Sequence, residues 1–350
     1  LLVCARASGL FKSCRQIAQV YVYQYTSQVQ DIVLVFVHVL NRLSVQIYRT
    51  FSRRRTLAAI FFLCAITFSQ FCHICGRCIC EIQGKFVILQ PIMKVKAIFF
   101  DIDGTLVSIK THAILPSAKQ AIRAARRQGV KVFIATGRPG LFIDNLEDLE
   151  YDGIIETNGA HCELTDGTVI SHHPIPQQDV KRMTEYHLTY DLPVVYAAHD
   201  ELFITSHTPT SDMIFRMLNL TPPQLGHMEH ALEMDILQII AFFDSQEEPF
   251  LMDHVLPGCV AQRWHPTFAD VIAKGCDKST GIDETIRHLG ISLEETMAFG
   301  DGGNDVGMLA HVGLGVAMGN ASDAVKQYAD YVTADVDEDG VARALERFVL

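Results

Sequence analysis

The stretch "IFFDIDGTLV" (residues 98–107) decides the fold, because an apolar run ends there in two carboxylates, Asp101 and Asp103. Side chains at positions i and i+2 of a strand point to the same side, so both carboxylates can approach one point. Two unscreened carboxylates that close would force one of them to keep a proton at neutral pH. A divalent cation removes that conflict and leaves one carboxylate free to act as a nucleophile. Gly104 lets the backbone turn sharply, and Thr105 offers a hydroxyl and an amide.

A calcium-binding loop is the main alternative interpretation of Asp-x-Asp-Gly. Such a loop needs further oxygen ligands and a glutamate at its twelfth position. Here Thr105 and "LVSIKTH" (residues 106–112) follow instead. The calcium interpretation therefore fails.

The chain consists of two parts with different compositions. Residues 1–92 contain 10 Lys and Arg, only Asp31 and Glu81 as acids, 7 of the 10 cysteines and no methionine. Residues 93–350 contain 19 Lys and Arg, 38 Asp and Glu, 3 cysteines and all 10 methionines. The formal charges are therefore +8 and −19, which make up the net charge of −11. Such a difference in composition indicates that the two parts of the chain differ in origin or in role.

The acidic part argues against some partners and allows others. Strong negative charge disfavours a nucleic acid or an anionic membrane surface. It does not exclude a small phosphorylated molecule, because local cations and a metal can reverse the field inside a cleft. Cys162, Cys259 and Cys276 are too few and too scattered for a disulfide framework. We therefore expect a cytoplasmic protein, a monomer or a weak dimer, with no membrane segment in residues 93–350.

We expect residues 1–92 to be a non-native or disordered extension without a function, joined to a protein whose natural start is Met93. "RRRTLAAIFFLCAITF" (residues 53–68) resembles the basic and apolar regions of a signal peptide, but it lies more than 50 residues into the chain. Its apolar part is shorter than the ~20 residues that a membrane span needs. Cysteines 72, 75, 78 and 80 have a spacing that fits neither a ferredoxin cluster nor a zinc knuckle. A membrane anchor and a metal site remain the alternatives.

The rest of the chain predicts an α/β fold with a parallel, Rossmann-like sheet. Apolar runs of strand length end in small or acidic residues, and helical stretches begin at Pro116, Lys278 and Asn304. Strands that are apolar on both faces and alternate with helices indicate a parallel sheet covered on both sides. Ligands bind such sheets beyond the carboxyl ends of the strands. The apolar runs cover residues 96–103, 130–137, 151–159, 295–302, 313–320 and 329–335.

Residues 177–263 depart from this alternation. They mix a helical stretch, "DVKRMTEYHLTYD", with strand-like segments such as "PVVYAA" and "LFITSH". This mixture is typical of an α+β insertion. We therefore expect a catalytic core formed by residues 93–176 and 264–350, with a cap domain at 177–263 that determines substrate specificity.

Further polar clusters follow two other strands. In "ATGR" (residues 135–138), the Thr136 hydroxyl and the Gly137 amide can bind a phosphate. Arg138 can bind a substrate anion or pair with a surface acid. In "FGDGGND" (residues 299–305), Asp301 can complete a magnesium site with oxygen ligands. Asn304 and Asp305 can cap the next helix or hold the ligands in place.

A lysine beside the phosphate would neutralise both the nucleophile and the transferred group. Lys274 and Lys278 in "AKGCDKSTGI" are both candidates, and their spacing alone does not separate them.

These four motifs, in this order, resemble those of the haloacid dehalogenase phosphatase superfamily. The flanking "GVAMGNA" (residues 315–321), "ADYVT" and "EDGVARAL" segments and the position of the cap are similar to the Cof-type branch, which carries a class IIB (C2B) cap. The resemblance covers residues 93–350. It implies a magnesium-dependent phosphatase that hydrolyses small phosphorylated metabolites, above all sugar (hexose) phosphates, through an aspartyl-phosphate. A phosphomannomutase-like phosphomutase of the same superfamily and an inactive phosphate-ligand binding module are the alternatives.

The resemblance also implies roles for single residues. Asp101 would be the nucleophile and Asp103 the general acid and base. Mg²⁺ would bind the Asp101 carboxylate, the Asp103 backbone carbonyl and Asp301, with Asp305 supporting these ligands. Lys278 matches the family lysine better than Lys274 does. The remaining residues expected to contact phosphate or substrate are Gly104, Thr105, Thr136, Gly137, Arg138, Asn158 and Asn304.

The motifs leave the substrate-contacting residues of the cap undetermined. His187, His199, His207 and His230 are expected to be surface or structural residues.

Overall fold

A computed structural model of the chain describes residues 78–82, 85–89, 95–146 and 148–350. The chain divides into two units, Leu1–Pro91 and Ile92–Leu350. The described part of the first unit is one antiparallel pair, β1 (Cys78–Ile82) and β2 (Lys85–Leu89). The segment 53–68, Cys72 and Cys75 lie outside the described residues. Within the described part of the chain, every helix is too short or too polar to cross a membrane.

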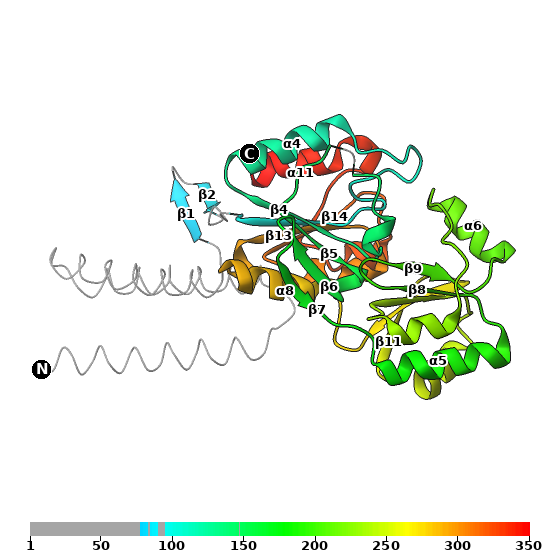
Figure 1. The fold of residues 1–350 in the computed structure, drawn as a ribbon. Coiled ribbons are helices and arrows are strands. Elements are labelled where there is room, and N and C mark those ends of the chain that lie inside the picture. The colour runs from blue at the N-terminus through cyan, green and yellow to red at the C-terminus, as the bar shows by residue number, and fades with distance from the viewer. Residues whose placement is uncertain (1–77, 83–84, 90–94, 147) are drawn as a thin grey trace, which may run out of the picture. The chain divides into compact units, whose positions relative to one another are not determined.

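The second unit contains an eight-stranded sheet with β3 (Ala97–Phe100) near its centre (Figure 1). Its strand order is β15-β14-β13-β3-β4-β5-β6-β7. The strands from β15 to β5 are parallel, and β6 and β7 continue the sheet as antiparallel strands. The other strands are β4 (Lys131–Ala135), β5 (Gly153–Glu156), β6 (His161–Leu164), β7 (Val169–His172), β13 (Thr296–Gly300), β14 (Leu314–Ala317) and β15 (Tyr331–Val332).

Helices cover both faces of this sheet (Figure 1). The side chains of β3 alternate between the faces: Ile98 and Phe100 belong to the core beneath α4 and α11, while Phe99 packs with Ile282 and Met308 beneath α8 and α9. All four residues of β3 are buried, as expected for a strand that is apolar on both faces. These helices are α4 (Pro116–Arg127), α8 (Lys278–Leu289), α9 (Val306–His311) and α11 (Gly340–Phe348), and the short α10 (Asp323–Lys326) lies between β14 and β15 in sequence.

A second, antiparallel sheet of five strands lies between the two halves of the first in sequence. Its order is β11-β12-β10-β8-β9. The sheet extends past residue 263, because β11 crosses that position and pairs with β12. Its strands are β8 (Val194–Ala197), β9 (Leu202–Ile204), β10 (Gln238–Ala241), β11 (Cys259–His265) and β12 (Phe268–Ala273), and its helices are α5 (Gln177–Tyr190), α6 (Pro209–Met217) and α7 (Glu248–Phe250).

Short helical turns complete the unit. A π-helical turn at Leu251–Val255 packs with α5 on one face of the five-stranded sheet. The 3-10 turns are Gly140–Phe142, Thr157–Gly159, Met228–Glu233, Leu293–Glu295, Gly303–Asp305 and Val336–Glu338. Thr157–Gly159 directly follows β5, and Gly303–Asp305 begins three residues after the end of β13.

Candidate active site

Asp101 lies directly after β3 and contacts a buried lysine. Its backbone N–H donates to the Phe299 carbonyl of β13 at 3.1 Å, which continues the sheet by one residue. Lys278 Nζ donates to Asp101 Oδ1 and to Asp305 Oδ1, both at 2.6 Å. The lysine is the first residue of α8, which begins with the Asp277 side chain accepting from the Thr280 N–H. Lys274 is exposed, so Lys278 is the lysine that the fold brings to the carboxylates.

Asp305 holds the loop that carries Asp301. Asp305 Oδ2 accepts from the backbone N–H groups of Asp301 and Gly302 at 2.9 and 2.8 Å. Since Asp305 Oδ1 accepts from Lys278, both of its oxygens are already engaged. Thr105 Oγ1 donates to Asp301 Oδ1 at 3.0 Å, which leaves Asp301 facing Asp101 across the sheet edge.

Crowding and burial shift the pKa values of this cluster. Burial, with the neighbouring Asp305, raises the pKa of Asp101 well above its usual value. Burial and Asp305 also raise the pKa of Asp301, to about 7. Burial alone would lower the pKa of Lys278, but Asp101 and Asp305 outweigh it and raise that pKa, so the lysine stays charged. The raised pKa values of Asp101 and Asp301 show that their ionised forms are costly here, so a further cation beside Lys278 would stabilise them.

The donor set fits a hard divalent cation. Asp101, Asp301 and Asp305 each place one oxygen within 4.8 Å of the others. Gly104 has a φ of +81°, and a Cβ at this position would lie 2.3 Å from Asp301 Oδ2, so the glycine keeps that oxygen accessible. Carboxylate oxygens are the protein ligands that Mg²⁺ prefers.

Asp103 is paired with a cation of its own. Arg138 donates from Nε and Nη2 to the two Asp103 oxygens at 2.7 and 2.6 Å. Arg138 is buried, and its Nη1 also donates to the Phe142 carbonyl at 2.8 Å. Arg138 therefore pairs with an acid of the site and not with a surface acid. Asp101 and Asp103 each face a different cation, which offsets their mutual repulsion.

The residues expected to bind phosphate lie beside one another at the ends of β4 and β5. The Asn158 N–H donates to the Thr136 carbonyl at 2.9 Å, and Asn304 Nδ2 donates to Asn158 Oδ1 at 3.0 Å. Asn158 is buried with a φ of 51°, and its Nδ2 has no hydrogen-bond partner among the described residues. A Cβ on Gly137 would lie 3.0 Å from that nitrogen. Because an orphaned buried donor is costly, this position suits a ligand oxygen.

The sequence interpretation missed one residue of the site, Asn320. Its Nδ2 donates to the Gly104 carbonyl at 2.8 Å and to Asp301 Oδ2 at 3.1 Å. The available signal was the "GVAMGNA" segment, in which Asn320 lies three residues after the end of β14.

Three of the four histidines expected to be surface or structural pair with neighbouring groups: His187 with the Leu192 carbonyl, His207 with Asp212 and His230 with Glu201. His199 instead lies 3.0 Å from Glu156 of β5.

Comparisons with known proteins agree with this geometry. Residues 98–345 match the family model of the haloacid dehalogenase-like hydrolases. The structure is similar to that of BT4131, described as a class IIB sugar phosphatase of the superfamily, at 43% identity and a TM-score of 0.68, over 73% of this chain and 99% of that one. BT1666 from Bacteroides thetaiotaomicron, described among the phosphatases of the superfamily, is 37% identical with a TM-score of 0.69, over 75% and 98% of the two chains.

A sequence relative gives the same result. The 5-amino-6-(5-phospho-D-ribitylamino)uracil phosphatase YitU of Bacillus subtilis is 30% identical over 264 residues, which cover 72% of this chain and 96% of that protein. The predicted superfamily and its α/β fold are thereby confirmed. The chain belongs to the haloacid dehalogenase-like hydrolase family and is an enzyme of its phosphatase type.

Proposed function

We propose that this chain is a magnesium-dependent phosphatase that hydrolyses sugar phosphates, hexose phosphates in particular, through an aspartyl-phosphate. The observation that carries the proposal is Lys278, which holds the Asp101 carboxylate beside Asp301 at the end of the central strand. The sugar phosphatase and the phosphoribityl phosphatase among the similar proteins support a small phosphorylated substrate.

In the first step, an Asp101 oxygen attacks the phosphorus atom in line with the leaving group. The bond between phosphorus and the sugar oxygen breaks as the new bond forms, and Asp103 gives a proton to the departing alkoxide. In the second step, Asp103 takes a proton from a water molecule that attacks the aspartyl-phosphate. Inorganic phosphate leaves, and Asp101 is restored. Lys278 balances negative charge on Asp101 and on the transferred group throughout.

Asp103 can act as an acid only if one of its oxygens is free to carry a proton. Both oxygens are engaged by Arg138 in the substrate-free arrangement. We therefore expect Arg138 to exchange one or both of these bonds for oxygens of the substrate. This exchange would make Asp103 available only when a substrate anion is present, which disfavours premature proton transfer.

Phosphate contacts come from the ends of the neighbouring strands. The Thr136 hydroxyl accepts from the Arg138 N–H at 3.1 Å and keeps its own proton for a phosphoryl oxygen. Asn158 Nδ2 offers its unpartnered donor close to Gly137 and Asn304. The backbone amides of Gly104, Thr105 and Gly137 offer further donors. Because phosphoryl transfer depends mostly on positioning and charge neutralisation, this set supplies what the reaction needs.

Asp101, Asp301 and the backbone carbonyl of Asp103 would hold Mg²⁺, and Asp305 and Asn320 would fix the Asp301 loop. When bound, Mg²⁺ neutralises charge on the phosphoryl oxygens and the nucleophile.

We further propose that the inserted α+β segment is a cap that closes over the site and selects the substrate. It begins at residue 177, and we place its end after β12 because β11 and β12 belong to its sheet. The free and buried thiols of Cys162, Cys259 and Cys276 support a reducing location such as the cytoplasm.

The test is phosphate release from a panel of hexose phosphates, pentose phosphates and a phosphoribityl compound, with and without Mg²⁺. We expect turnover that requires Mg²⁺ and is fastest on one sugar phosphate. Isomerisation of a hexose phosphate in the presence of a sugar bisphosphate, without release of inorganic phosphate, would indicate a phosphomutase instead. No release from any ester would indicate a binding module and would contradict the proposal.

A further inference from the structure

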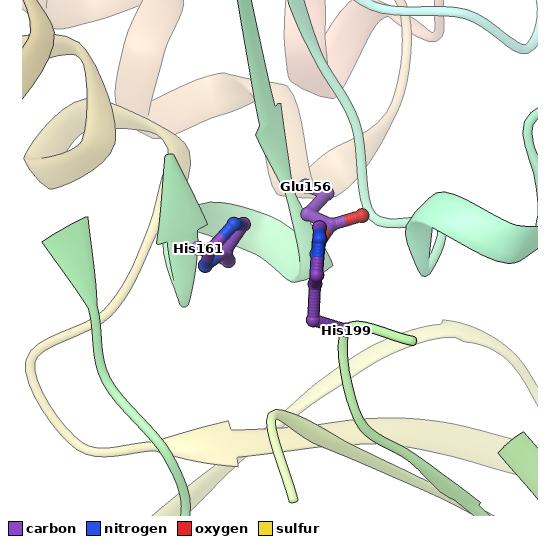
Figure 2. Close-up of side chains that lie close together, drawn as sticks. All are labelled: Glu156, His161 and His199. Atoms are coloured by element: carbon purple, nitrogen blue, oxygen red, sulfur yellow. The ribbon is translucent and has the colours of Figure 1, made fainter. Parts of the chain in front are cut away.

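A second cluster of chemically competent side chains lies where the cap meets the core. Glu156 is the last residue of β5, His161 is the first residue of β6, and His199 comes from the turn between β8 and β9 of the five-stranded sheet. Figure 2 shows the Glu156 carboxylate and the His199 ring approaching from opposite sides, with the His161 ring beside them. The proposed phosphatase mechanism uses none of these three residues.

The three side chains converge on one point. Each offers a nitrogen or oxygen atom within 4.8 Å of those of the other two. His199 Nδ1 lies 3.0 Å from Glu156 Oε1, and the rings of His161 and His199 have centroids 4.4 Å apart. In a tetrahedral site with metal–ligand bonds of about 2.0–2.2 Å, neighbouring ligand atoms are separated by about 3.3 Å. The distance between the Glu156 and His199 ligand atoms is already close to this value, and the remaining distances lie within 4.8 Å.

Burial prepares two of the groups for a cation. The side chains of Glu156 and His161 are each 2% exposed, whereas that of His199 is 48% exposed and leaves a route from solvent. Burial raises the pKa of Glu156, so its carboxylate gains from a nearby positive charge. Burial lowers the pKa of His161, which favours the neutral ring that binds metals.

We propose that Glu156, His161 and His199 bind a divalent transition-metal ion of the Zn²⁺ class, which joins the cap to the core. Two imidazoles and one carboxylate are a ligand set that Zn²⁺ accepts, with a water molecule at the fourth position. The set differs from the all-carboxylate cluster at Asp101, because imidazole selects zinc-like ions whereas carboxylates suit Mg²⁺. The two sites are therefore expected to hold different metals.

Neighbouring groups support the ligands from outside. Glu163 Oε2 lies 3.1 Å from His161 Nε2 and 3.4 Å from His199 Nε2. His172 Nδ1 lies 3.0 Å from His161 Nδ1. Whichever nitrogen of His161 binds the ion, the other keeps a hydrogen-bond partner. Such outer partners fix the ring orientation of metal-binding histidines.

The consequence follows from where the ligands originate. Glu156 and His161 belong to the core sheet, and His199 belongs to the cap sheet. A bound ion would hold the two domains in the arrangement that brings these atoms together. In the proposed function, the cap opens and closes during turnover. The effect of the ion on the domains therefore rests on the proposed function, whereas binding of the ion does not.

The test is direct Zn²⁺ binding to the full chain in a large excess of Mg²⁺, measured by equilibrium dialysis with metal analysis. Cysteines elsewhere in the chain can also bind Zn²⁺, so the result is the difference between the wild type and the variant His199→Ala. We expect the variant to lose one Zn²⁺ per chain. His230→Ala is the matched control, since His230 is a cap histidine paired with Glu201, and it should keep the full amount.

Glu156→Gln tests the carboxylate ligand. It should weaken this Zn²⁺ binding by at least 10-fold, because the loss of a residue that only supports a ligand already costs about 10- to 100-fold in metal affinity. Circular dichroism confirms that each variant is folded. Equal Zn²⁺ binding by the wild type and His199→Ala would overturn the proposal and leave a hydrogen-bonded network only. This experiment measures no activity, so its failure is distinct from a failure of the proposed phosphatase.

Discussion

The site at Asp101 and the cluster at Glu156 both crowd carboxylates with basic groups, but they balance charge in different ways. At the first, Lys278 and Arg138 are built into the chain and hold Asp101 and Asp103 at 2.6–2.7 Å. At the second, the partners of Glu156 and Glu163 are imidazoles, which can be neutral near pH 7. The first site therefore has permanent cations, and the second depends on a proton or a metal ion from solution.

Removing the proposed nucleophile should break the first site completely. Asp101→Asn keeps the shape of the side chain but cannot form the aspartyl-phosphate, so we expect kcat to fall by about 10⁴-fold or more. The measurement is steady-state phosphate release with the best substrate of the panel. Thermal melting close to that of the wild type would show that folding is intact, and wild-type rates from this variant would refute the mechanism.

Removing the permanent cation should damage both activity and stability. Lys278→Met leaves Asp101 and Asp305 without their buried partner, and breaking such a pair costs about 3–5 kcal/mol of unfolding free energy. Loss of the charge should lower kcat by about 10³-fold. Chemical denaturation and kinetics measure the two effects. Lys274→Met is the matched control on an exposed lysine of the same segment, and equal damage from both variants would contradict the assignment.

Changing the shape of the second cation should have a smaller effect. Arg138→Lys keeps a positive charge but loses the two-pronged contact with Asp103. We expect kcat/KM to fall by about 10²-fold, because Asp103, the proposed catalytic acid, is then misplaced. Arg123→Lys, which makes the same change in an exposed pair with Asp148, should leave kinetics unchanged. Unchanged kinetics for Arg138→Lys would mean that the paired hydrogen bonds from Arg138 to Asp103 have no catalytic importance.

Loosening the Asp301 loop should weaken metal binding without removing a ligand. Asn320→Ala deletes the donor to Gly104 and Asp301, so the Mg²⁺ concentration for half-maximal activity should rise about 10-fold. Activity at saturating Mg²⁺ should approach that of the wild type. A fall in kcat with an unchanged Mg²⁺ requirement would instead place Asn320 in contact with the substrate.

The smallest effect is expected from the outer partner of the second cluster. Glu163→Gln removes the charge next to His161 and His199, which should weaken Zn²⁺ binding by about 10-fold. Phosphatase kinetics with Mg²⁺ should not change. Glu201→Gln, next to His230, is the control and should leave Zn²⁺ binding unaltered. A loss of Mg²⁺-dependent activity in Glu163→Gln would show that the two clusters are not independent.

Local pattern was sufficient to predict the core sheet and its polar edge. β3, β4 and β13 are apolar on both faces, and Asp101, Thr136 and Asp301 follow them directly. Because the carboxyl ends of parallel strands lie at the same edge of a sheet, these residues come together there, and the prediction needs no knowledge of other contacts.

Contacts between distant segments could not be predicted in the same way. The sequence alone does not decide whether Arg138 binds a substrate anion or a surface acid, because its actual partner, Asp103, lies 35 residues away. The choice of Lys278 depends on where α8 begins, which the Asp277 and Thr280 capping pair determines. Glu156 and His199 meet only because the turn between β8 and β9 lies against the end of β5, and no local sequence pattern predicts that contact. The β11–β12 hairpin likewise extends the second sheet beyond the expected boundary through pairing, not through composition.

The position of β3 between β4 and β13 has a consequence for biosynthesis. Asp101 and β4 leave the ribosome early, but the hydrogen bonds from Lys278 to Asp101 and from Thr105 to Asp301 span 177 and 196 residues. Until β13 is synthesised, β3 keeps an open edge that can pair with other chains. Residues 177–273 are thus synthesised before Asp101, the proposed nucleophile, can contact Lys278. A product truncated before α8 would contain every residue of the first motif but would lack Lys278 and Asp301, which contact that motif.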